Sequence, residues 1–303
     1  MLTEALKDLT TRDFPSLGDS ILNQKELVEG GVSLAGLLST KRAGIMREPD
    51  LEPKHEMKKR ASIPADPAEA ADQILNEATS RNITVKLLGG LAFKRICPSS
   101  KEGALARNNN DVDLAVKRND VSKLKKLMDE LGYEYPLRAN VTHPDQILYI
   151  DNQNRRQVDI FVDGFQMCHK LDFRKGLEGA GQTLPITELI MTKLQIVEIT
   201  DKDLQDLCAA FFDFRLGQEA GNIRYNEIAR LASRNWGIWK DFTTNLANLK
   251  ERASVLAPDK ANVVAGRVDE LLKYIEKRPK SARWGARALI GERLQWHELP
   301  QKR

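Results

Sequence analysis

Two apolar stretches of this chain each carry acidic residues where a buried strand would be expected to carry apolar ones. The first is DVDLAV at residues 111–116, and the second is RQVDIFVD at residues 156–163. Successive side chains of a strand point to opposite faces, so Asp111 and Asp113 are expected on one face. Asp159 is the acid inside the second stretch. If the two strands lie side by side, Asp159 completes a cluster of three carboxylates.

Such a cluster of carboxylates points to a metal site. Ionised carboxylates at short range repel one another, and each keeps its charge only beside a strong compensating charge. A hard divalent cation provides that charge, because carboxylate oxygens are its preferred ligands. Three carboxylates can hold two Mg²⁺ ions about 3.5–4 Å apart for in-line phosphoryl chemistry. We therefore predict a magnesium site and catalytic centre at Asp111, Asp113 and Asp159, with Asp159 as third ligand or general base.

A glycine pair upstream of the acids could receive a phosphate group. LLGGLAFK places Gly89 and Gly90 at the end of a predicted strand and before a possible helix start. Glycine lets backbone N–H groups approach an anion closely, and a helix N-terminus adds positive potential. Such a pair alone is typical of ordinary turns, whereas together with the acids it predicts a phosphate-binding turn. Arg107, just before the acidic strand, could contact phosphate or solvent.

The chain divides into three parts with different patterns. Residues 1–65 are irregular, and their charged, proline-bearing second half is typical of a linker or mobile arm. Residues 66–170 mix helical and strand-like patterns joined by short links, as in a small mixed α/β sheet. Residues 171–303 follow the 3.6-residue period of amphipathic helices. The predicted fold class is α+β, a small mixed sheet with flanking helices followed by an all-helical C-terminal domain.

Local signals define the elements within residues 66–170. Asp66 is expected to cap a helix with Pro67 in its first turn, and Asp120 or Asn119 to cap another that ends at Gly132. Three strand-like runs follow, namely YEYPLR, QILYID and RQVDIFVD, and QNRR between the last two predicts a hairpin turn.

Composition excludes several classes of protein. No stretch approaches the roughly 18 consecutive apolar residues of a membrane helix, and the N-terminus lacks the apolar segment of a secretory signal, so a cytoplasmic protein without membrane contact is expected. The three widely spaced cysteines favour neither a disulfide framework nor a zinc site. A net charge of +4 is too mild to argue for a dedicated nucleic-acid binder.

The order of these motifs resembles the nucleotidyltransferase superfamily with the polymerase-β-like minimal fold. The resemblance rests on Gly89–Gly90, on Asp111-x-Asp113 and on Asp159. The segments LPITELIMTKLQ and DKDLQDLCAA, at residues 184–195 and 201–210, look most similar to those of AbiEii-type and MenT-type nucleotidyltransferase toxins. Together the matching parts cover roughly residues 70–215. One departure is the spacing of 21 positions from Gly90 to Asp111, which is longer than in the family.

The resemblance implies a magnesium-dependent transfer of an NMP from an NTP to an acceptor hydroxyl, with release of pyrophosphate. It further implies that Lys193 contacts the triphosphate and that Asp203 or Asp206 helps to position it; without the resemblance, all three would be taken as surface charges. The toxin-like branch implies tRNA or a protein as acceptor and an antitoxin as partner. Three alternatives stay open: a small-molecule acceptor of the aminoglycoside type, a non-catalytic module that binds nucleotide or a partner, and an RNA-binding protein with incidental acids.

Overall fold

A computed structural model describes residues 62–140 and 145–298 of the chain. All of these residues belong to one compact unit, Met57–Arg303. The predicted arm at residues 1–65 lies outside the described residues except for 62–65. The domain boundary expected near residue 170 falls inside this unit and stays a prediction.

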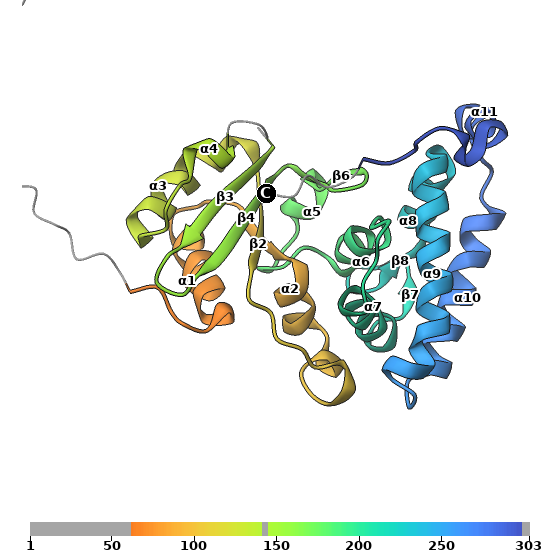
Figure 1. Cartoon of the computed structure of the whole chain (residues 1–303), viewed down its shortest axis with the longest axis horizontal. Helices are drawn as coiled ribbons and strands as arrows, with labels where there is room; N and C mark the ends of the chain where they lie inside the picture. The colour runs from red at the N-terminus through yellow and green to blue at the C-terminus, as the bar shows by residue number, and fades with distance from the viewer. Residues whose placement is uncertain (1–61, 141–144, 299–303) are drawn as a thin grey trace, which may run out of the picture. The chain divides into compact units, whose positions relative to one another are not determined.

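A four-stranded mixed sheet, with the strand order β1-β2-β4-β3, forms the centre of the first half (Figure 1). β1 runs antiparallel to β2, β2 parallel to β4, and β4 antiparallel to β3. The central strands β2 and β4 carry buried apolar residues on both faces, as expected for strands that are covered on both sides. This confirms the predicted small mixed sheet. The strands are β1 Val85–Leu88, β2 Val112–Val116, β3 Gln146–Asp151 and β4 Arg156–Val162.

Two of the flanking helices begin and end where the sequence predicts. The Asp66 carboxylate caps α1 (Pro67–Ser80) by accepting the backbone N–H groups of Ala68 and Glu69 at 2.8 and 3.0 Å. α3 (Val121–Leu131) ends at Gly132, whose φ of 94° favours glycine. Asp120 occupies the predicted cap position of α3, but its side chain does not cap the helix. It accepts the Thr84 N–H at 2.9 Å instead and so joins the start of α3 to the start of β1.

One predicted strand is wrong. In the run YEYPLR, Glu134 forms only an isolated bridge with Ile150, and the short helix α4 (Leu137–Asn140) takes over after Pro136. Proline has no N–H to donate to a ladder, which explains why pairing stops there. The predicted hairpin between β3 and β4 is confirmed by their antiparallel register.

The second half of the chain is helical apart from two short ladders. β5 (Gly164–Gln166) pairs with β6 (Lys170–Asp172), and the two-residue strands β7 (Leu216–Gly217) and β8 (Ile223–Arg224) pair in parallel. Among the described residues, no helix combines the length and the apolar character needed to cross a membrane. The helices are α5 Arg174–Glu178, α6 Ile186–Leu194, α7 Asp201–Asp213, α8 Tyr225–Arg234, α9 Trp236–Leu256, α10 Ala261–Lys277 and α11 Ala282–Ile290.

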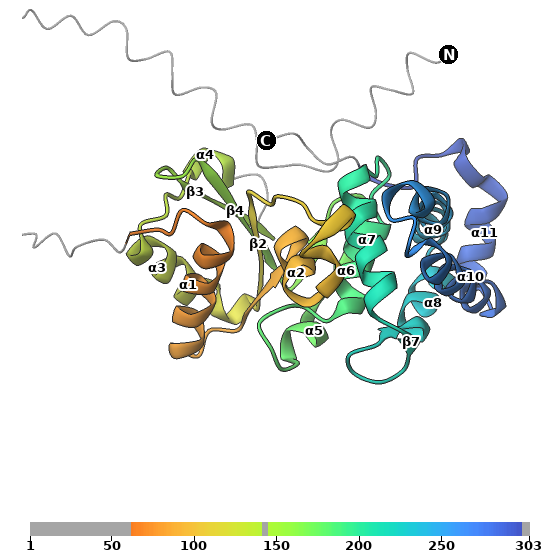
Figure 2. The ribbon, with the colours of Figure 1, turned by 90° about the horizontal axis from the view of Figure 1, so that it is seen from below.

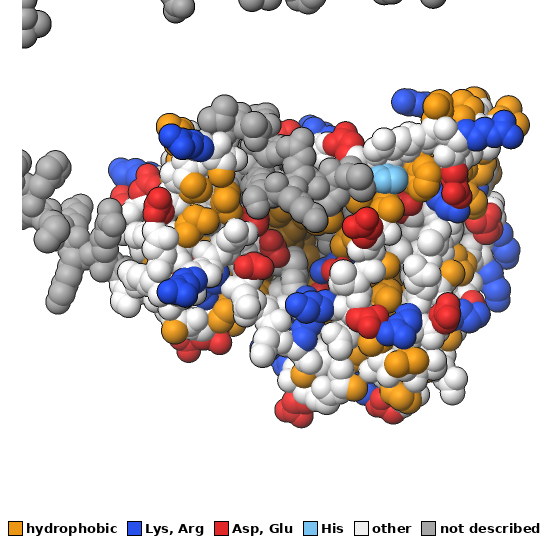
Figure 3. Space-filling view, viewed as in Figure 1, with side chains coloured by type: hydrophobic (Ala, Val, Ile, Leu, Met, Phe, Trp, Pro, Cys, Tyr) orange, Lys and Arg blue, Asp and Glu red, His pale blue; other side chains and the backbone are white. Residues whose placement is uncertain are grey.

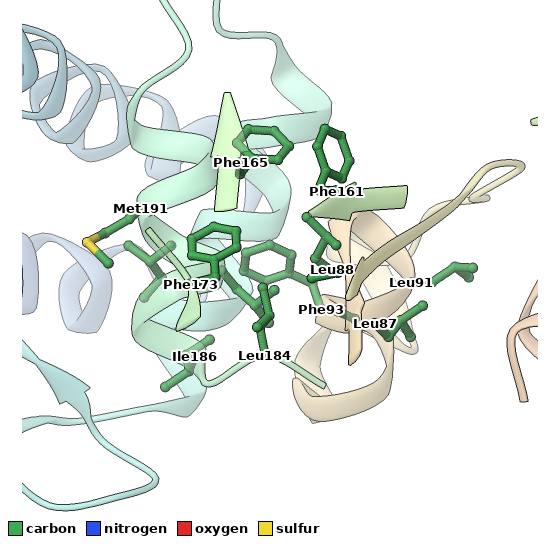
Figure 4. Packing of buried hydrophobic residues seen from close by; sticks show 14 of the residues in the cluster. Leu87, Leu88, Leu91, Phe93, Phe161, Phe165, Phe173, Leu184, Ile186 and Met191 are labelled. Atoms are coloured by element: carbon green, nitrogen blue, oxygen red, sulfur yellow. The ribbon is translucent and has the colours of Figure 1, made fainter. Parts of the chain in front are cut away.

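Helix α2 (Gly89–Ile96) connects the sheet to the helices. It follows β1 directly and lies beside α6 and α7 (Figure 2). Phe93 on α2 is fully buried in a cluster that takes in Leu88 of β1, Phe161 of β4 and Met191 of α6 (Figure 4). This packing brings α6 and α7 close to the turn between β1 and α2.

The segment between α2 and β2 is hydrogen-bonded to the end of α7. It contains two 3₁₀ turns, Pro98–Ser100 and Gly103–Leu105. The N–H and hydroxyl of Ser99 both donate to Asp213 Oδ2 at the end of α7, at 3.0 and 2.8 Å. The long spacing between the glycine pair and the acidic strand is therefore ordered structure that spans from the sheet to α7.

Candidate active site

The parallel pairing of β2 and β4 places two of the predicted acids side by side. Asp113 is the register partner of Asp159, so both side chains leave the same face of the sheet. Both residues are half-buried. Gln146 of β3 donates from Nε2 to Asp159 Oδ1 at 3.0 Å, which fixes the orientation of that carboxylate. In the space-filling view, acidic side chains gather beside a hollow in the visible face (Figure 3).

Asp111 takes a different place from the other two acids. β2 begins at Val112, so Asp111 precedes the strand and is exposed. Across residues 62–140 and 145–298, no three His, Cys, Asp or Glu side chains come together as a ready metal-binding group. The structure therefore pairs Asp113 with Asp159 and leaves Asp111 at the edge of the site.

The environment of Asp113 disfavours its negative charge. Desolvation and, after it, the neighbouring charges of Asp159 and Asp111 together raise the pKa of Asp113 to about 7, against the opposing effect of Lys193 and Arg107. A bound cation would relieve this repulsion. Mg²⁺ is commonly bound by one or two protein carboxylates, with water and substrate phosphates as its other ligands. The Asp113–Asp159 pair, made only of carboxylate oxygens, fits that donor set.

The glycine pair lies directly against the side chains of the site. Gly89 has a φ of 68°, in the left-handed region that favours glycine. A Cβ on Gly89 would overlap Asp113 Oδ2 and lie 2.7 Å from Asp113 Cγ. A Cβ on Gly90 would overlap Asn109 Oδ1 and Arg107 Nη2. Backbone conformation and close contact both favour glycine at position 89, whereas at position 90 only the approach of polar side chains to the start of α2 does.

A buried network of four charges lies next to the carboxylate pair. Arg107 donates to both oxygens of Asp206, from Nε at 3.0 Å and from Nη2 at 2.6 Å. Lys193 Nζ lies 2.7 Å from Asp203 Oδ1 and 3.1 Å from Asp206 Oδ2. The four side chains are between 4% and 17% exposed. The sequence-predicted residues of α6 and α7 thus meet one another and Arg107 in a single network.

The carboxylates of this network stabilise its cations, and Lys193 stabilises Asp203. Burial opposes the charge on Lys193, but the carboxylates of Asp206 and Asp203 outweigh it and raise the pKa of the ammonium. Burial also opposes the charge on Asp203, and Lys193 outweighs it and lowers the pKa of that carboxyl. Thr200 fixes Asp203 from the other side, because its hydroxyl donates to Oδ2 at 2.7 Å. The network therefore keeps two cations charged and in place beside Asp113.

Arg107 belongs to this site, although its sequence position alone did not predict a role for it. Its position before the acidic strand was a signal for either phosphate or solvent, and its partner Asp206 lies 99 positions away. The arrangement as a whole joins a carboxylate pair suited to a divalent cation with a glycine turn and two fixed cations suited to phosphate oxygens. Such a combination can bind and orient a nucleoside triphosphate with its metal.

Among known proteins, this chain resembles several solved structures, but it matches no family model and no curated sequence. A solution structure of the antibiotic-resistance factor ANT(2'')-Ia is 13% identical, with a TM-score of 0.36 over 69% of this chain and 94% of that chain. An antigenic nucleotidyltransferase-like protein from Paracoccidioides brasiliensis is 12% identical, with a TM-score of 0.34 over 71% and 94%. The STING-associated CdnE c-di-GMP synthase from Capnocytophaga granulosa is 13% identical, with a TM-score of 0.24 over 69% and 79%.

At these TM-scores the likenesses carry no argument about the activity of this chain.

Proposed function

We propose that this chain is a nucleotidyltransferase that moves an NMP from an NTP to an acceptor hydroxyl and releases pyrophosphate. The observation that carries the proposal is the pairing of Asp113 with Asp159 directly beside the Gly89–Gly90 turn. The charge network of Lys193 and its partners, on the neighbouring helices α6 and α7, supports it with cations for the triphosphate.

Asp113 and Asp159 would hold Mg²⁺. Asp111 would add its negative charge to the site or act as a further ligand. A second Mg²⁺ ion would complete the site. Bound Mg²⁺ would neutralise the charge that develops on the transferred phosphoryl group. The acceptor oxygen attacks the α-phosphorus, its proton passes to Asp159 as general base, and the bond to pyrophosphate breaks. In such reactions the protein contributes mainly by positioning and by stabilising charge.

The turn and the cations would bind the rest of the nucleotide. Backbone N–H groups at Gly89 and Gly90, at the N-terminus of α2, would bind the phosphates. Lys193 contacts the triphosphate, and Asp203 and Asp206 hold its ammonium in position. The roles of Lys193, Asp203 and Asp206 follow the resemblance to AbiEii-type and MenT-type toxins, and the ion pairs among these residues support them.

The same resemblance is the basis for the acceptor. We propose tRNA or a protein hydroxyl as acceptor, an antitoxin as partner and the cytoplasm as location. A screen of labelled NMP transfer to total tRNA, to total protein and to an aminoglycoside distinguishes these acceptors.

The catalytic roles are tested by Asp113→Asn and Asp159→Asn. With each of the four NTPs and Mg²⁺, we expect both variants to lose at least about 100-fold in NMP transfer and pyrophosphate release, because metal ligands and charge-stabilising groups have effects of this size. Asp172→Asn is the matched control, since this acid is exposed on β6 and pairs with Arg174. Undiminished transfer by Asp113→Asn would contradict the metal role. Calorimetry that shows NTP binding without pyrophosphate release would instead identify a non-catalytic module.

A further inference from the structure

A cationic pocket lies in the helical half of the chain, among residues that take no part in the proposed active site. It is about 440 Å³ in volume, within the range of pockets for small ligands. It lies where the end of α8 meets the segment between α10 and α11, and Ser281 N–H donates to Ser233 O at 3.0 Å to join the two. The lining residues are Ser233, Arg234, Arg278, Pro279, Lys280 and Ser281.

Half of the lining residues are cations, and none of them is an acid. Arg278 is half-buried and Arg234 is exposed. Within the described ranges, neither guanidinium forms an ion pair or a hydrogen bond. The pocket therefore contains two arginine side chains whose donors face no protein acceptor in that part of the chain.

Lys280 is fixed at the same place by several contacts. Its Nζ donates to Ile275 O and lies 4.0 Å from Glu276 Oε2 and 5.8 Å from the centre of the Trp284 ring. Glu276 already accepts a hydrogen bond from Trp239 Nε1 at 2.9 Å through its other oxygen. Glu276 is thus at the edge of contact with Lys280, and a lining of three cations without an acid leaves the pocket with an excess of positive charge.

We propose that this pocket is an oxyanion site that binds a phosphate group through Arg234, Arg278 and Lys280. Like charges held together in a concave surface repel one another, and a bound anion removes that repulsion. A phosphate group has enough acceptor oxygens for three cations, and the planar guanidinium fork matches pairs of them. The phosphate can be free or carried by a nucleic acid strand, because both present the same oxyanion.

Hydrogen exchange on the full-length protein tests this site locally. The two probes are inorganic phosphate and a single-stranded oligonucleotide without terminal phosphates, each compared with chloride at matched ionic strength. We expect slower exchange of the peptide that contains residues 278–285 when the pocket is filled. If only inorganic phosphate slows exchange of this peptide, the ligand of the pocket is a small phosphate compound. If both probes slow it, the pocket also binds a phosphodiester strand. No protection by either probe overturns the proposal.

Two variants separate a built site from diffuse charge. Arg278→Gln should weaken phosphate binding by about tenfold or more, since it removes a charge-assisted hydrogen bond. Arg283→Gln is the matched control, because Arg283 is exposed at the start of α11 and lies outside the lining. Equal weakening in both variants would overturn the proposal. Because exchange is measured at the pocket itself, the result is independent of whether the chain transfers nucleotides.

Discussion

Substitution of Gly89 by alanine tests the closest contact in the candidate active site. Gly89 has a φ of 68°, and a Cβ there would overlap the Asp113 carboxylate. Gly103 is the matched control, because its φ is 71° and a Cβ there meets no atom within 4 Å. Both alanine variants incur the same backbone strain, and only Gly89→Ala intrudes on Asp113.

The two costs can be separated. A left-handed conformation costs an L-residue about 1–2 kcal/mol, so Gly103→Ala should lower the free energy of unfolding by that amount. Gly89→Ala adds the cost of forcing an extra methyl into a packed site, about 1–3 kcal/mol. We therefore expect a loss of about 2–5 kcal/mol for Gly89→Ala, as measured by urea unfolding.

Activity should separate the two variants more sharply than stability does. Displacement of the Asp113 carboxylate should lower NMP transfer by about 100-fold in Gly89→Ala, measured where both variants are folded, and leave Gly103→Ala unchanged. In an Asp113→Ala background only Cβ of residue 113 stays near, at 3.0 Å, so most of the excess destabilisation should vanish. Full activity of Gly89→Ala, or an excess that persists without the carboxylate, would refute the reasoning.

Three further predictions concern charge and packing. Without divalent cations, the raised pKa of Asp113 means that its contribution to stability is complete below the ordinary pKa of 3.8 and is lost as the pH rises to about 7. Urea unfolding should therefore show a free energy of unfolding that declines over this pH range in the native chain and declines less in Asp113→Asn. The same decline in both proteins would contradict the prediction. Asp206→Asn leaves Arg107 and Lys193 with less compensation and should lower the free energy of unfolding by about 3 kcal/mol; a loss below about 1 kcal/mol would show that solvent screens the network. Phe93→Ala should cost about 3–5 kcal/mol because its ring is fully buried, and a smaller change in thermal or urea unfolding would mean that the core collapses around the gap.

Features that depend on near neighbours in sequence were predictable. The cap at Asp66, the end of α3 at Gly132 and the β3–β4 hairpin each follow from a few adjacent residues, and the structure has all of them. The run YEYPLR is not a strand, because Pro136 lacks the N–H that continued pairing needs.

Features that depend on distant contacts were only partly predictable. The acids at positions 113 and 159 stood out because each interrupts an apolar strand, but their direct pairing depends on the register of two strands joined by a crossover. The side chain of Asp120 bonds to Thr84, and Arg107 pairs with Asp206, through contacts that no local pattern encodes. Asp111 fell outside the ladder because the strand begins one residue later.

The partnership between Arg107 and Asp206 also bears on how the protein is made. A nascent chain that has emerged only as far as α6 already has both glycines, both paired acids and Lys193, but neither carboxylate of α7. Arg107 and Lys193 would then lack the counter-charges that hold both cations in one network. Synthesis of α7 thus supplies the two carboxylates that balance Arg107 and Lys193.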